Sequence, residues 1–215
     1  MAGVRAKATS KITVYSLLSL YGVITLMPLY WIFVTAFKSP EEAIGYPPTL
    51  IPKSFTFENL IRIFVDSQVF GYRPFMNSVI IALGTALLAV VLAFLAGYGF
   101  ARYRFPGRDI LLVSMLFINL LPLIAIVIPL FRLFILYRLY DTYIGLILLH
   151  GLKTAPFTAW LMKNYIDSLP EELEEQAMLD GCSPRQTMIR IVAPLAAPGL
   201  AAVAILAFRQ AWNDF

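Results

Sequence analysis

The segment 171–194 is charged and is flanked by long apolar runs, so it is the part of the chain best suited to a specific interaction. Four glutamates open this segment, and Asp180 and Gly181 follow them. Because glycine adopts a positive φ without strain, Gly181 is predicted to end a first helix and to turn the chain. Ser183 and Pro184 are predicted to be the N-cap and the first residue of a second helix. By composition alone, the segment could also be an ordinary exposed loop.

The sequence contains no pattern typical of a catalytic centre. It has no glycine-rich nucleotide-binding loop, no Ser/His/Asp set and no zinc-ligand spacing. His150 is the only histidine, and no cysteine, glutamate or second histidine stands near it at ligand spacing, so a packed polar side chain is favoured over a metal ligand. Cys182 is the only cysteine, which excludes a disulfide within the chain. We therefore expect no catalytic site, no metal and no cofactor.

The composition is that of a membrane protein. Sixty per cent of the residues are hydrophobic and 14% are charged, with a mean hydropathy of +0.76, whereas about a quarter of the residues in a typical soluble domain are charged. Four stretches lack any charge, namely 12–37, 74–101, 110–131 and 191–208. Each is close to, or longer than, the roughly 18–20 residues with which a helix spans the hydrocarbon core.

A fifth candidate span, Thr142 to Met162, contains His150 and Lys153. An ionisable group in the middle of a span usually faces protein or water. For Lys153, the structural alternative, in which a neighbouring helix solvates the ammonium or the side chain snorkels, is given even weight. Continuous apolar runs favour helices over a barrel. The predicted fold is therefore an all-α polytopic membrane protein with about five transmembrane helices. A face of small residues near the end of the second span is predicted to pack closely, formed by Ala93, Ala96, Gly97, Gly99 and Ala101.

The distribution of basic residues predicts the orientation. The N-terminus carries Arg5, Lys7 and Lys11, and the connection after the second span carries three arginines, so both are predicted to be cytoplasmic. Alternation of the spans then places 38–76 outside and 166–194 in the cytoplasm. A short amphipathic helix is expected within 57–70 of the outer segment.

The segment 171–194 resembles the Glu-Ala-Ala loop of ABC-importer permeases. Glu175, Ala177, Gly181, Ile191 and Pro194 match that pattern, whereas Gln176 and Ala193 depart from it. Further similarity to permeases of the carbohydrate-uptake type, including the maltose-transporter subunit, extends from about Tyr15 to Phe215. It is carried by Asn77-Ser78, by Tyr98 and 102–107, by Pro129-Leu130-Phe131 and by Ala211-Trp212-Asn213-Asp214.

This resemblance implies a single transmembrane domain over 1–215 with a cytoplasmic coupling helix. Members of the family have six spans, so a C-terminal span would be missing, as in a fragment or a truncated gene, and the 215-residue chain is expected to be inactive in transport. The coupling residues implied are Glu175, Gln176, Ala177, Asp180, Gly181, Ile191 and Pro194. The implied partners are a second permease, two ATP-binding cassette subunits and an extracytoplasmic solute-binding protein, in a cell inner membrane and without nucleic acid. The implied substrate is a sugar, an oligosaccharide or a related polyol.

Candidates for the substrate pathway are Asn119 and Asn213, although an interhelical hydrogen bond is the favoured alternative for Asn119. Asp214 is expected to be hydrated or paired, because a carboxylate at mid-membrane costs about 2.5–3.5 kcal/mol. Two other functions are less favoured, namely a secondary transporter or channel that does not use ATP and a membrane scaffold, because neither needs a cytoplasmic docking helix such as the one predicted in 171–194; the sequence also shows no repeat, and its spans are nearly free of charge. A secondary transporter would predict inverted repeats and intramembrane charges.

Overall fold

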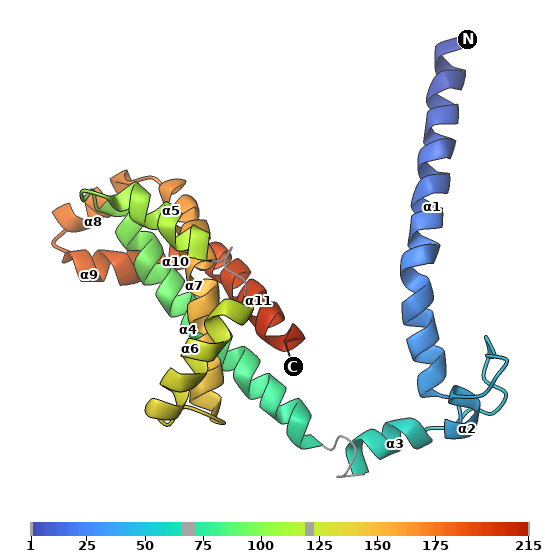
Figure 1. Ribbon diagram of the computed structural model, residues 1–215. Coiled ribbons are helices and arrows are strands. Elements are labelled where there is room, and N and C mark those ends of the chain that lie inside the picture. Colours follow the sequence, from blue (N-terminus) through green and yellow to red (C-terminus); the bar gives the residue numbers. More distant parts are fainter. Residues whose placement is uncertain (1, 66–71, 119–122, 215) are drawn as a thin grey trace. The chain divides into compact units, whose positions relative to one another are not determined.

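The computed structural model describes residues 2–65, 72–118 and 123–214, and this part of the chain is helical with no strand. The chain divides into two compact units, Met1–Pro74 and Phe75–Phe215. The first unit contains α1 (Ala2–Ala36), α2 (Pro40–Ala43) and α3 (Glu58–Val65). Helix α1 is long and apolar enough to cross a membrane over Lys11–Ala36 (Figure 1). Helix α3 confirms the predicted short helix as far as Val65; residues 66–70 lie outside the described residues.

Residues 38–57 of the first unit fold back onto the end of α1 through polar contacts. The ammonium of Lys38 is buried; it donates to the carbonyl oxygen of Thr49 at 2.5 Å and lies 4.5 Å from the centre of the Trp31 ring. The carboxylate of Glu42 accepts hydrogen bonds from the Thr49 hydroxyl at 2.6 Å and from the Lys53 backbone N–H at 3.0 Å. These bonds, led by that of Thr49, lower the pKa of Glu42. Residues 38–57 are thus held against the end of α1.

The second unit contains the remaining helices (Figure 1). They are α4 (Tyr72–Arg102, whose first residues precede the unit boundary), α5 (Arg108–Ile118), α6 (Leu123–Leu136), α7 (Tyr143–Asp167), α8 (Glu172–Leu179), α9 (Pro184–Thr187), a π-helical turn (Met188–Val192), α10 (Ala193–Leu195) and α11 (Ala197–Asn213).

The described residues contain three helices that are long and apolar enough to span a membrane, α1, α4 and α7. A fourth span results if the pair 184–195 and 197–213, bent by 73°, is counted as one. The bend lies within the predicted span 191–208, which is therefore not one straight helix. The predicted span 110–131 contains α5 and the first part of α6, and residues 119–122 between them lie outside the described residues. The number of five spans stays a prediction.

Small residues let α4, α7 and α11 approach closely. A Cβ added at Gly97 of α4 would lie 2.7 Å from the Met162 side chain of α7, and one at Gly199 of α11 would lie 2.8 Å from the Tyr165 ring. The buried stripe of α4 consists of Ala82, Ala86, Ala89, Ala93 and Gly97, at spacings of three and four residues. The predicted small-residue face is therefore confirmed for Ala93 and Gly97 and wrong for Gly99, where an added Cβ would meet nothing within 4 Å.

Candidate functional site

The turn after α8 has the geometry that the sequence predicts. Gly181 has a φ of +92°. The N–H of Cys182 donates to the carbonyl oxygen of Ala177 at 3.0 Å, and the N–H of Gly181 donates to that of Met178 at 3.1 Å. This pair of bonds is the Schellman motif, which satisfies the last carbonyls of a helix and requires a residue with positive φ. An added Cβ at Gly181 would meet no neighbour, so glycine is needed here for its backbone conformation and not for space.

The second helix of the segment begins as predicted and then changes its winding. The Ser183 side chain accepts from the Gln186 N–H, and the Gln186 side chain accepts from the Ser183 N–H, which is a capping box. After Thr187 the helix widens into a π-helical turn, in which the N–H of Ala193 donates to the carbonyl oxygen of Met188. Pro194 has no N–H and cannot continue the α-helical bonding pattern, which accounts for the change at this point.

Arg102, whose side chain is 9% exposed at the end of α4, holds residues 166–174, which we call the root of the segment. The Arg102 guanidinium contacts the Glu174 carboxylate at 2.6 Å and the Glu171 carboxylate at 3.4 Å. It also donates to the carbonyl oxygens of Ile166 and Leu169, at the C-terminal end of α7, at 3.1 and 3.2 Å. A cation at a helix C-terminus and carboxylates at a helix N-terminus are both favoured by the helix dipoles. One side chain thereby joins α4, α7 and α8.

This contact is largely withdrawn from water. The side chains of Arg102 and Glu174 are 9% and 8% exposed, and the Tyr98 hydroxyl donates to the second oxygen of Glu174 at 3.0 Å. A buried charge is tolerated when it is paired and its remaining hydrogen-bonding capacity is satisfied, as here. Sequence reasoning did not single out Glu174; it named Glu175, whose side chain is exposed, for the different role of coupling, which stays a prediction. The available signal was the spacing of Tyr98 and Arg102, which puts both side chains on one face of a helix.

The predicted coupling residues fall into two groups. Those with exposed side chains are Glu175, Gln176, Asp180 and Pro194, and those with buried or half-buried side chains are Ala177 and Ile191. Residues 175–181, which we call the tip of the segment, also expose two apolar side chains, Met178 at 45% and Leu179 at 87%. Carboxylates beside exposed apolar side chains, on a segment with a fixed root, form a surface suited to binding another protein.

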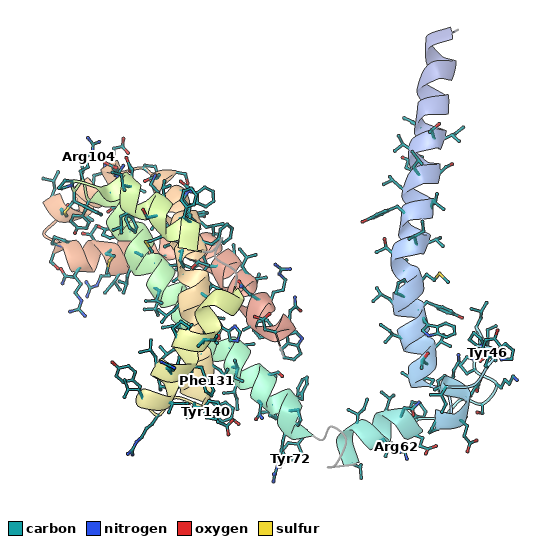
Figure 2. All side chains as sticks on the ribbon, viewed as in Figure 1. Tyr46, Arg62, Tyr72, Arg104, Phe131 and Tyr140 are labelled. Atoms are coloured by element: carbon teal, nitrogen blue, oxygen red, sulfur yellow. The ribbon has the colours of Figure 1, made fainter. Side chains whose placement is uncertain are left out.

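The segment and the arginine-rich connection after α4 lie at the same end of the unit. Figure 2 shows Arg104 at that end, near α8 of Figure 1, and Phe131 and Tyr140 at the other end of the unit. Their rings meet edge to face, with centroids 5.3 Å apart. Helix α7 therefore runs from the end that carries Tyr140 to the end that carries α8.

A second polar cluster joins α7 and α11. The Asp214 carboxylate lies 3.4 Å from Nδ1 of His150 and 3.6 Å from the ammonium of Lys153. The expectation that Asp214 is hydrated or paired is met, because its side chain is 40% exposed and pairs with His150 and Lys153. Lys153 of α7 thus contacts the residue that follows α11. Asn213 is exposed at the end of α11, whereas Asn119 lies outside the described residues. The described residues include no group of three or more metal-ligating side chains.

Comparison with known proteins gives consistent matches. Residues 89–215 match the model of the family described as binding-protein-dependent transport system inner membrane component. The inner membrane ABC transporter permease protein YcjP of Escherichia coli is 36% identical over 210 residues, which are 97% of this chain and 75% of that protein. The trehalose transport system permease protein SugB of Mycobacterium tuberculosis is 38% identical over 189 residues, which are 88% of this chain and 68% of that protein.

A solved structure has the same fold. It is that of a bacterial ABC transporter involved in the import of the acidic polysaccharide alginate. The TM-score is 0.83 at 23% sequence identity, and the match covers 97% of this chain and 72% of the other.

Proposed function

The chain belongs to the family of binding-protein-dependent transport system inner membrane components, and from this membership we propose how it receives the energy of ATP and what it carries. It is a multi-pass membrane protein and a permease subunit of an ATP-driven importer, and permeases of this family are not enzymes themselves. The proposal concerns the segment 166–194, the partner subunits and the substrate.

We propose that the segment 166–194 is the coupling loop, which lies in the cytoplasm and receives the movement of the ATPase. The observation that carries this proposal is the buried contact of Arg102 with Glu174. A force on the exposed tip would act on α8, and Arg102 would pass it to the ends of α4 and α7. The backbone from Ser183 onward continues through helical turns into α11, which provides a second connection. The segment would therefore move as one rigid element, with its tip in contact with the ATPase and its root fixed to α4 and α7.

Each of the predicted coupling residues has a role in this proposal. Glu175, Gln176 and Asp180 contact the ATPase, with the Glu175 carboxylate facing a basic group. Ala177 packs the helix onto the unit, and Gly181 holds the turn. Ile191 and Pro194 shape the backbone between the loop and α11.

The proposed assembly has a second, similar permease, two ATP-binding cassette subunits and an extracytoplasmic solute-binding protein. Family membership supports these partners. A second permease is also expected because one subunit of this size encloses too little surface for a sugar pathway. The proposed location is the cell inner membrane, with the N-terminus in the cytoplasm; the arginines near α8 support this side. The proposed substrate is a sugar, an oligosaccharide or a related polyol, supported by relatives such as the trehalose permease.

The coupling role is tested by reversing one charge. Glu175→Lys is compared with Glu172→Lys, which makes the same reversal at another exposed residue of α8, nearer the root of the loop. Substrate-stimulated ATP hydrolysis is measured in proteoliposomes that contain the complete transporter. We expect a loss of stimulation with Glu175→Lys and a much smaller effect with Glu172→Lys. Wild-type stimulation in the Glu175 variant would refute the assigned contact.

A further inference from the structure

A polar groove lies between α7 and α11. The two helices pack side by side and antiparallel, since Gly199 lies against Tyr165 and Asp214 lies beside Lys153. The groove has a volume of about 330 Å³, and its wall includes Lys153 from α7 and Arg209 from α11. Lys153 is the eleventh of the 25 residues of α7, counted from Tyr143, so the groove opens near the middle of a helix that is long enough to span a membrane.

The charges in the groove do not balance. Asp214 lies 3.6 Å from the Lys153 ammonium, and among the described residues no carboxylate comes within 4.0 Å of the Arg209 guanidinium. Arg209 is exposed and is the thirteenth of the 17 residues of α11, and it lines the groove together with Lys153 of α7. Charged side chains within membrane-spanning segments usually mark a pathway for a substrate or an ion. A packed scaffold has no need for a second cation here, whereas a binding site for an anion does.

Most of the hydrogen-bond donors that face the groove and are not used within α7 belong to charged side chains. The hydroxyls of Thr154 and Thr158 donate to carbonyl oxygens of their own helix, at 3.0 Å each to His150 and Thr154. The remaining donors in the wall are the Lys153 ammonium, the Arg209 guanidinium and the side-chain amide of Gln210. The guanidinium offers paired N–H groups that match the two oxygens of a carboxylate or a phosphate, and the ammonium adds a point charge.

We propose that this groove binds the anionic group of an acidic sugar, a carboxylate, sulfate or phosphate, during its passage through the transporter. This inference rests on the sugar-import function proposed above and narrows its substrate class. Asp214 neutralises one of the two cations, so that Arg209 is the main partner of the substrate's anion. The sugar ring would then lie along Phe157 and Gln210, which share the wall with Arg209.

The test uses the complete transporter in proteoliposomes, with this subunit expressed from its whole gene together with its partner subunits. Uptake is measured for a panel of uronate-containing and phosphorylated sugars and for the neutral sugar from which each is derived. We expect uptake of acidic members, and a roughly ten-fold to hundred-fold rise in the half-saturating concentration with Arg209→Gln, the range that loss of a charged hydrogen bond predicts. Arg209→Lys should lose less, and Arg132→Gln, at an exposed arginine of α6, should change nothing.

The outcomes separate the two proposals. Uptake of neutral sugars alone overturns the anion site and leaves the sugar importer standing. Uptake of acidic sugars that Arg209→Gln and Lys153→Gln leave unchanged shows that the anion binds elsewhere, which also overturns the assignment to this groove. Uptake of no sugar of either kind overturns the proposed substrate class and the groove together. Basal ATP hydrolysis by each variant checks that it has folded and assembled.

Discussion

Removal of the Arg102 side chain should release the coupling loop while the spans stay folded. Arg102→Met keeps an apolar stem of similar length and deletes the guanidinium. The change leaves the Glu174 carboxylate, which is 8% exposed, without its cation, and it leaves the carbonyl oxygens of Ile166 and Leu169 without this donor. Removal of one partner of a buried ion pair costs about 3–5 kcal/mol. Since 1.4 kcal/mol is a factor of ten, the conformation in which α8 packs on Arg102 should lose roughly a hundred-fold to a few thousand-fold in population relative to conformations in which α8 is detached.

Amide hydrogen exchange over Glu172–Leu179 measures this opening in the assembled transporter, together with substrate-stimulated ATP hydrolysis. We expect much faster exchange in α8 and a loss of stimulation, with unchanged exchange in the middle of α4. Arg185→Met, at an exposed arginine of the same loop, is the matched control and should behave as wild type.

The double variant Arg102→Met/Glu174→Leu distinguishes a lost ion pair from general damage. Replacement of both partners of a buried pair by apolar residues removes the unpaired charge and is often close to neutral. We therefore expect slower exchange in α8 of the double variant than in Arg102→Met, although the Tyr98 hydroxyl loses its acceptor. Wild-type exchange and wild-type coupling in Arg102→Met would refute the reasoning, because the guanidinium would then not hold the loop.

Three further predictions concern single residues. Gly97→Ala should destabilise the packing of α4 on α7 by about 1–3 kcal/mol, because the new Cβ would lie 2.7 Å from the Met162 side chain of α7. Gly99→Ala should not destabilise it, because an added Cβ there meets nothing within 4 Å. The thermal stability of the purified subunit compares the two variants. Gly181→Ala should cost about 1 kcal/mol or more, because φ is +92°, and should speed exchange at the turn. Thr49 and other donors lower the pKa of Glu42 in the folded state, so the stabilisation of residues 38–57 should persist above the ordinary pKa of 4.5 and disappear as the pH falls through the lowered pKa. Limited proteolysis at decreasing pH should show this loss in wild type and not in Glu42→Gln.

Sequence reasoning succeeded where the cause is local. The positive φ of Gly181 and the cap at Ser183 each depend on a few neighbouring residues, and both were predicted correctly. The apolar runs predicted a helical membrane protein for the same reason, since hydrophobic length is a property of a single segment. The family followed from the spacing of matched residues in the coupling loop and was confirmed by comparison.

The tertiary structure alone decided which distant side chains meet. Arg102 and Glu174 are 72 residues apart, and their contact depends on how α4 packs against α7 and on how α8 follows α7. The sequence predicted that Asp214 needs a partner, but only the antiparallel packing of α11 on α7 identified Lys153 and His150. The same holds for Gly97 and Gly99, which look alike in sequence and face different surroundings. Local preference determines turns and helices, whereas ion pairs and close approaches depend on the rotation of each helix about its axis, which packing against the others fixes.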